Sequence, residues 1–177
     1  MLDAILTAIP FGIILSFTIG PVFFVLLETS ATKGVKSALI FDSGVILADI
    51  FFIIVAFYST NKLLEKVKDD PSFLIFGGVL LTAYGLISFI KTSKSFREIV
   101  KEYHKVEFKK DYGKLFIKGF LLNFINIGVL LGWLSFIVIG NSLTETTYQL
   151  QIFLATILLV YFLVDLLKIA AAKTLKN

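Results

Sequence analysis

Thr18-Ile19-Gly20-Pro21 interrupts the first apolar segment of this 177-residue chain. The surrounding residues, 4–27, are numerous enough to cross a bilayer as a helix, since about 20 residues are needed. Proline lacks an amide N–H and clashes with the preceding helical turn, and the neighbouring glycine frees the backbone. Within a membrane, freed backbone groups are tolerated only where protein or a water-lined cavity satisfies them. The sequence therefore predicts a broken membrane helix with a candidate binding site at the break.

The composition indicates an all-α integral membrane protein. Hydrophobic residues make up 57% of the chain and charged residues 17%, whereas soluble domains average about 45–50% and about 25%. None of the apolar segments alternates with period two as barrel strands do. The segments predict five transmembrane helices, at residues 4–27, 38–59, 73–90, 115–139 and 150–172.

Several function classes are excluded by what the sequence lacks. It has no cysteine, which excludes thiol chemistry, iron–sulfur clusters and cysteine-bound metals. His104 is the only histidine and no acidic cluster has metal-ligand spacing, so we expect neither a metal nor another cofactor. No phosphate-binding loop or nucleophile elbow appears, so no enzyme is predicted. The net charge of +4 fits cytoplasmic lysines better than nucleic-acid binding.

The basic residues predict the orientation in the membrane. With the N-terminus outside, 14 lysines and arginines fall on the inner side and 3 on the outer side. Because basic residues collect on the cytoplasmic side, we expect the N-terminus outside and the C-terminal end of the chain inside. Nine of the 14 lie in or next to a basic loop at residues 91–114, in which residues 95–107 have the spacing of a short amphipathic helix on the inner leaflet.

A second segment echoes the first. Residues 11–25 (FGIILSFTIGPVFFV) align without gaps with residues 118–132 (KGFLLNFINIGVLLG), and the break at Gly20 falls opposite Asn126-Ile127-Gly128. Since three predicted helices separate the starts of these segments, the two copies cross in opposite directions, as in an inverted-topology repeat. We therefore expect a first membrane repeat at residues 1–90, the basic loop at 91–114, and a second, incomplete repeat at 115–177.

These motifs also carry a family resemblance. In order along the chain they are Gly12, Gly20-Pro21, Gly34, Gly44 with Asp49, Ala83-Tyr84-Gly85, and Gly119 followed by Asn123 and Asn126. With them the chain resembles the lysine exporter (LysE/RhtB) family of bacterial inner-membrane proteins. The resemblance implies a six-helix exporter of amino acids and related small solutes that runs on proton motive force.

The sequence departs from the family pattern in three places. Ile19 and Ile127 stand where the family usually has proline, so we expect softer breaks. Five predicted helices stand where the family has six, so a further span or a partner chain would have to complete the fold. A homo-oligomer is therefore left open.

Asp49 is the strongest candidate site residue, because a carboxylate near the centre of a membrane helix is costly and rarely lacks a function. It is predicted to carry a proton or to bind a substrate ammonium group. Asp42, seven residues earlier, shares its helical face, and Asp165 is the acid of the second half. We predict Asp49, Asp42 and Asp165 as proton-coupling residues. The structural alternative is that each is merely capped by a neighbouring donor, as Lys168 could do for Asp165.

The predicted substrate-binding residues are Gly20, Pro21, Asp49, Asn123 and Asn126. The two asparagines could instead only hold neighbouring helices together by hydrogen bonds. With these residues, the leading hypothesis is a secondary-active, proton-coupled exporter of amino acids or similar small solutes. The alternatives are a membrane scaffold or accessory subunit that transports nothing, and a cation exporter. The expected partners are a small-molecule substrate and the lipid bilayer, without nucleic acid.

Overall fold

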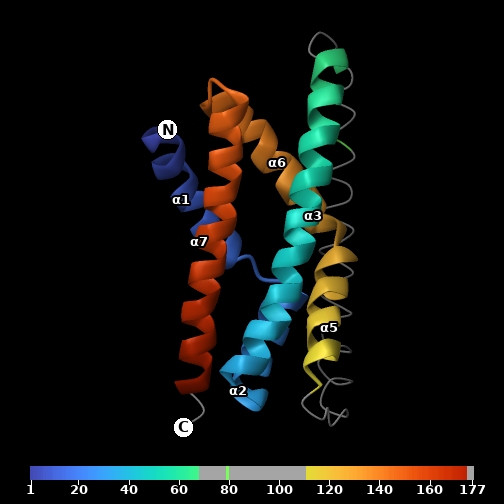
Figure 1. Ribbon diagram of the computed structural model, residues 1–177, viewed down its shortest axis with the longest axis vertical. Helices are drawn as coiled ribbons and strands as arrows, with labels where there is room; N and C mark the ends of the chain where they lie inside the picture. Colours follow the sequence, from blue (N-terminus) through green and yellow to red (C-terminus); the bar gives the residue numbers. More distant parts are fainter. Residues whose placement is uncertain (68–78, 80–110, 175–177) are drawn as a thin grey trace. The chain divides into compact units, whose positions relative to one another are not determined.

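The computed structural model describes residues 1–67, 79 and 111–174, and this part of the chain is helical with short connections (Figure 1). The third predicted span, at 73–90, and the amphipathic helix predicted at 95–107 lie outside the described residues. Residues 1–60 and 110–177 form one compact unit, and the account below concerns that unit. The helices are α1 (Leu2–Ser16), α2 (Pro21–Lys33), α3 (Val35–Val67), α5 (Tyr112–Phe124), α6 (Ile127–Leu143) and α7 (Thr147–Thr174).

The first predicted helix is broken where the sequence indicated. α1 ends at Ser16, α2 begins at Pro21, and the two helices bend by 75°. Proline suits the first position of a helix because its missing N–H is not needed there. Gly20 has an extended backbone (φ −154°, ψ 179°), and a Cβ placed on it would meet nothing within 4 Å. Pro21 therefore suits the start of α2, and the conformational freedom of the glycine is not required at this break.

The second break is also sharp, contrary to the expectation of a softer one. α5 ends at Phe124, α6 begins at Ile127, and the helices bend by 64°. Asn126 caps α6, with its side-chain Oδ1 accepting a hydrogen bond from the Gly128 amide at 3.1 Å. An asparagine N-cap satisfies an otherwise orphaned helix amide. This cap defines the start of α6 although isoleucine replaces the usual proline.

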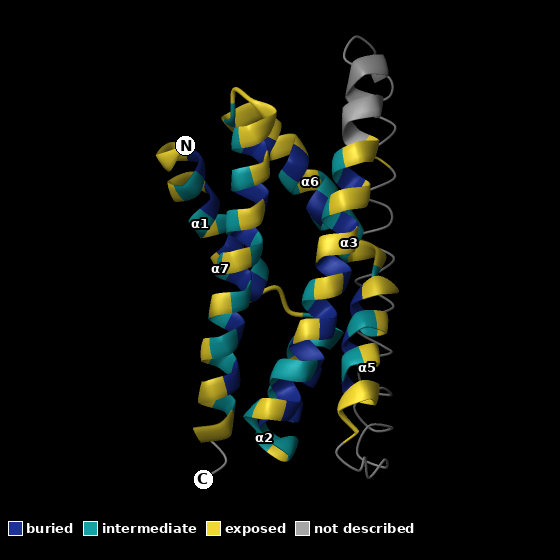
Figure 2. Ribbon diagram, in the orientation of Figure 1, coloured by how far each residue is buried: buried dark blue, intermediate teal, exposed yellow. Residues whose placement is uncertain are grey.

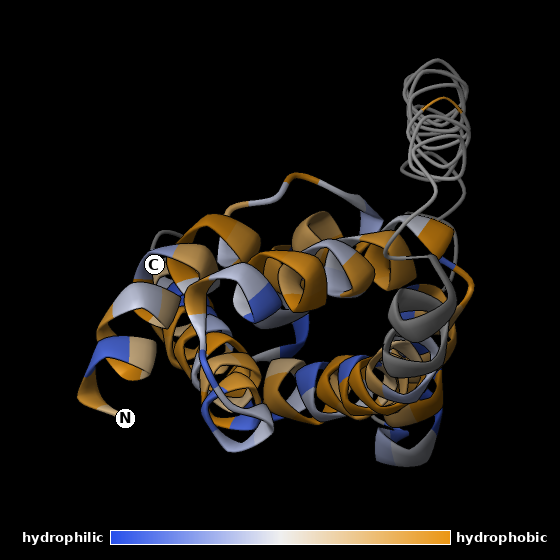
Figure 3. Cartoon of the chain, turned by 90° about the horizontal axis from the view of Figure 1, so that it is seen from above, coloured by the Kyte–Doolittle hydropathy of each residue, from blue (hydrophilic) through white to orange (hydrophobic). Residues whose placement is uncertain are grey.

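Among the described helices, α3 and α7 have by themselves the length and hydropathy of membrane spans. Two single helices could cross a membrane, or up to four spans exist if each bent pair is one span. Large apolar side chains remain exposed on their outer faces, including Phe51, Ile54 and Leu167, and hydrophobic colouring dominates the view from above (Figure 3). Soluble proteins rarely expose this much apolar surface to water, whereas the hydrocarbon core of a membrane accommodates it. The prediction of an integral membrane protein made of helices is confirmed.

The core is formed by helices from both halves of the sequence. Ala8 of α1 and Phe153 of α7 are fully buried, and Trp133 of α6 is 1% exposed (Figure 2). Phe11 packs edge-on against Phe153 and Phe136, with ring centroids 5.7 and 6.0 Å apart. The segments before and after the basic loop are therefore packed into one core.

Two glycines bring α3 and α5 into backbone contact. A Cβ placed on Gly44 of α3 would overlap the carbonyl oxygen of Phe116, and one placed on Gly119 of α5 would overlap the carbonyl oxygen of Phe41. Small residues allow helix backbones to approach this closely in membranes. The contact positions α5, and thus the second break, against the face of α3 that carries Asp49.

The two bent pairs run in opposite directions. The N-terminus and the α6–α7 turn lie at one end of the unit, whereas the α2–α3 junction, the start of α5 and the C-terminal end of α7 lie at the other (Figure 1). Gly34, with φ at 90°, makes the tight α2–α3 junction possible. Each bent pair thus has its break between the two ends, where both breaks can contribute to one site.

Candidate functional site

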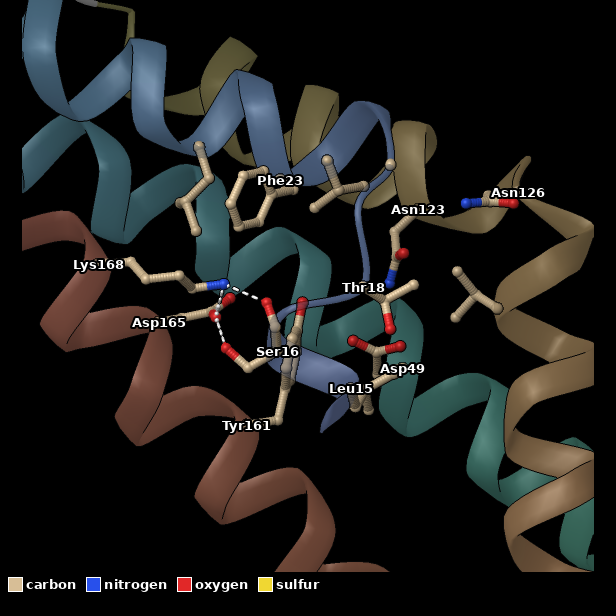
Figure 4. Close-up of a pocket in the computed structure, with 14 residues that line it drawn as sticks. Leu15, Ser16, Thr18, Phe23, Asp49, Asn123, Asn126, Tyr161, Asp165 and Lys168 are labelled. Atoms are coloured by element: carbon tan, nitrogen blue, oxygen red, sulfur yellow. Dashed lines mark hydrogen bonds and ion pairs between the residues drawn. The ribbon is translucent and has the colours of Figure 1, made fainter. Parts of the chain in front are cut away.

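A pocket of about 80 Å³ lies where the two helix breaks meet (Figure 4). Both breaks contribute to its wall, together with the facing sides of α3 and α7. The lining residues are Leu15, Ser16, Thr18, Gly20, Val22, Phe23, Leu26, Asp49, Asn123, Asn126, Val129, Tyr161, Asp165 and Lys168. Most of the lining surface is apolar, but eight of the fourteen residues add a polar or charged side chain. Convergent polar groups on an apolar wall can orient a small molecule.

Asp49 projects from α3 into this pocket and is held by neutral hydrogen-bond donors. It is 3% exposed. The indole Nε1 of Trp133 donates a hydrogen bond to Asp49 Oδ1 at 2.9 Å, and the Asn123 side chain also faces the carboxyl group. No basic side chain pairs with Asp49 among the described residues. Its carboxyl group is thus buried, oriented and available to a cation or a proton.

The two asparagines have different roles. Asn123 is the second-last residue of α5, and its Nδ2 donates a hydrogen bond to the Val45 carbonyl oxygen of α3 at 3.1 Å. That bond links the second broken pair to α3, as the interhelical alternative predicted. Asn126 is the cap of α6, and both asparagines line the pocket.

A second acid lies on the opposite wall, on α7. Asp165 is fully buried. Its Oδ1 accepts from the Ser16 hydroxyl at 2.9 Å and is 2.5 Å from the Lys168 ammonium group. Lys168 also donates to the Ser16 carbonyl oxygen, at 2.6 Å. The predicted pair of Asp165 and Lys168 therefore exists, and it is linked to the last turn of α1.

Asp42 does not line the pocket, although it lies close to it. Its carboxyl group is fully buried and faces that of Asp165. Neither oxygen of Asp42 has a hydrogen-bond donor among the residues that the structure describes. Two ionised carboxylates can only accept hydrogen bonds, whereas one shared proton would satisfy a facing pair. The arrangement suits proton binding beside the pocket rather than contact with a substrate.

The helix ends add fixed partial charges to the pocket. Val22 and Phe23, in the first turn of α2, line it. The first amides of a helix lack intrahelical acceptors and carry the positive end of the helix dipole. Ser16, at the end of α1, contributes the negative end. A carboxylate and an ammonium group of one small molecule would therefore both find complementary groups here.

Most of the predicted site residues meet in the pocket. Gly20, Asp49, Asn123, Asn126 and Asp165 line it, whereas Pro21 begins the adjoining helix without lining it and Asp42 lies behind Asp165. The sequence analysis assigned no site role to Trp133, Ser16 or Tyr161, and it gave Lys168 only a pairing with Asp165. Lys168 was counted as a cytoplasmic charge, but its side chain is 11% exposed. Its spacing from Asp165 predicted the pair but not the burial.

Trp133→Phe is expected to lower stability by about 1–3 kcal/mol, because Asp49 loses a donor while buried. The aromatic packing against Phe136, with ring centroids 5.6 Å apart, is largely kept by phenylalanine. Thermal unfolding of the purified protein measures the effect. In an Asp49→Asn background the same substitution should cost less, because a neutral acceptor binds the indole more weakly. Equal costs in both backgrounds would show that the hydrogen bond is unimportant.

No group of three or more histidine, cysteine, aspartate or glutamate residues able to hold a metal ion occurs in residues 1–67 and 111–174.

Comparison with known proteins gives a consistent picture. The family model described as LysE type translocator matches residues 13–177. The chain is also similar to a Bacillus subtilis (strain 168) protein named "Putative amino acid efflux protein YcgF", with 26% identity over 181 residues that cover 99% of this chain and 83% of that protein. No solved structure matches.

Proposed function

Because the chain belongs to the LysE type translocator family, whose members are transporters and not enzymes, we propose that it exports amino acids or similar small solutes by a proton-coupled, secondary-active mechanism. The name of the Bacillus subtilis relative supports the substrate class. We place the protein in the bacterial cytoplasmic membrane.

One observation carries this proposal: both helix breaks open onto the same pocket as the buried carboxyl group of Asp49. Broken helices that meet at a central site are typical of transporters, in which half-helix ends bind charged groups of the substrate. The positive end of α2 at Gly20 and Pro21 would receive the substrate carboxylate. Asp49 would receive the ammonium group, and the apolar wall would receive a small side chain.

The acids provide a route for proton coupling. Asp49 alternates between binding the substrate ammonium and binding a proton, so that export of one is exchanged for entry of the other. Asp42 and Asp165, which face each other behind the pocket, can hold a further proton. Such intramembrane carboxyl groups are typical of proton pathways in transporters.

The packing of the glycines supports two inverted repeats that rock around the site. Gly12 of α1 lies against α7, and Gly119, its counterpart in the sequence alignment, lies in α5 against α3. If each bent pair counts as one helix, the first helix of each repeat contacts the second helix of the other. A twofold relation between the two repeats requires this reciprocal contact. Rocking of one repeat against the other would open the pocket to each side in turn.

The distribution of charge supports the predicted orientation. Lys33 and Lys36 flank the α2–α3 junction, and Lys114 and Lys173 lie in the first turn of α5 and the last turn of α7. Figure 1 shows these helix ends at one end of the unit and, at the other, the N-terminus and the α6–α7 turn, which hold Asp3 and Glu145. Lys168 is buried beside the pocket and Lys118 is half-buried in α5, so neither is a flanking charge. Without these two, the predicted topology still places 12 basic residues on the inner side and 3 on the outer side. We therefore place the N-terminus outside.

The proposal is tested by efflux of amino acids from proteoliposomes with an imposed pH gradient. We expect efflux of a neutral amino acid to accelerate when protons can move inward and to slow when an ionophore removes the gradient. A scaffold would give no efflux above empty vesicles. A cation exporter would move metal or potassium ions but no amino acid, and either result would overturn the proposal.

A further inference from the structure

A shell of polar and aromatic groups surrounds the ammonium group of Lys168 and would suit any primary ammonium ion. Its Nζ lies 2.5 Å from Asp165 Oδ1, 2.6 Å from the Ser16 carbonyl oxygen, and 4.9 and 5.9 Å from the ring centroids of Phe23 and Phe17. A carboxylate, a helix C-terminal carbonyl and aromatic faces each attract a cation. Lys168 is thus bound as a tethered cation.

This shell is part of the pocket and lies opposite Asp49. Asp165, Lys168, Ser16 and Phe23 all line the pocket, and Figure 4 shows Asp49 on the other side. The pocket therefore has two acids but only one without a cation, since the contacts of Asp49 come from the neutral groups of Trp133 and Asn123. The remaining wall is largely apolar.

We propose that Lys168 is a specificity residue: it occupies the subsite that a second substrate ammonium group would need, and so restricts the transporter to amino acids with uncharged side chains. This inference rests on the proposed function, because it presumes an amino acid in the pocket. A neutral amino acid uses Asp49 for its only ammonium group. A basic amino acid would bring a further cation towards Lys168, where Asp165 is already neutralised and like charges repel.

The expected consequence is that removal of Lys168 admits basic amino acids. Lys168→Met keeps an unbranched side chain and leaves Asp165 without its cation. We expect binding of L-lysine relative to L-alanine to rise by about tenfold or more, as for one new charge-assisted hydrogen bond. Thermal shift and competition against radiolabelled alanine, with the full chain in detergent, measure the ratio. Lys173→Met, an exposed lysine on the same helix, should leave it unchanged.

Two further variants test whether the charges of Lys168 and Asp165 cause the preference for alanine over lysine. Lys168→Arg keeps the charge and should keep the preference for alanine. Asp165→Asn with Lys168→Met removes both charges, so the relative binding of lysine should lie between those of the wild type and of Lys168→Met. Because this double variant buries no unpaired charge, it also serves if the single variant fails to fold.

The outcomes distinguish this inference from the function on which it rests. If the wild-type protein binds no amino acid, the proposed function fails. If it binds alanine but the Lys168→Met and double variants discriminate against lysine as strongly as the wild type does, only the role of Lys168 is overturned. If folded Lys168→Met loses alanine as well, Lys168 anchors the substrate carboxylate, and the specificity role is again overturned.

Discussion

Asp49→Asn is expected to abolish pH-gradient-driven efflux and to weaken amino-acid binding by about 10- to 100-fold. The binding loss is that of one charge-assisted hydrogen bond in a buried site. Asparagine has nearly the shape of aspartate, and its side-chain oxygen can still accept the hydrogen bond from Trp133 Nε1, which is 2.9 Å from Asp49 Oδ1 in the structure. The variant should therefore fold, and the defect should reflect the lost charge and proton site.

Binding, exchange and net efflux together identify which role is lost. If Asp49 binds the substrate ammonium, equilibrium binding and substrate exchange both fall. If it only carries the proton, exchange continues and the response to the pH gradient disappears. Glu145→Gln is the matched control, because it makes the same acid-to-amide change at an exposed residue in the α6–α7 turn. Full gradient-driven transport by Asp49→Asn would disprove the assigned role.

The parts of the site that the sequence could predict depend on local chemistry. Proline disfavours a helical conformation of the residue before it, which predicts a break at Gly20-Pro21, although Pro10 lies within α1 without ending it. A carboxylate such as Asp49 within an apolar helix is conspicuous without knowledge of its neighbours. The second break was predicted from its alignment with the first. Its sharpness was not, because the cap made by Asn126 Oδ1 on the Gly128 amide depends on a rotamer that sequence does not specify.

The remaining parts depend on contacts between distant segments. Ser16 and Asp165 are hydrogen-bonded across 149 residues of sequence, and Trp133 reaches Asp49 across 84. A tryptophan in an apolar helix gives no sign of which acid it will meet. Lys168 near a helix end has the pattern of a membrane-flanking lysine, and only the packing of α1 against α7 reveals that it is buried.

Substitution of Gly44 or Gly119 by valine is expected to cost about 3 kcal/mol or more and to reduce the yield of folded protein severely. A Cβ at either position would overlap a backbone carbonyl oxygen of the facing helix, that of Phe116 or of Phe41. A clash with backbone cannot be relieved by a rotamer change, so α3 and α5 would have to separate. Thermal unfolding and size-exclusion profiles in detergent measure the effect.

Gly132→Val is the matched control, because a Cβ at this helical glycine would meet nothing within 4 Å. It should fold as the wild type does. If Gly44→Val and Gly119→Val also fold normally, α3 and α5 do not pack as described. Asn123 would then not lie within 3.1 Å of the Val45 carbonyl oxygen and would not face Asp49. The fold test therefore bears on the site, since the same contact that requires the glycines brings the second break to the acid.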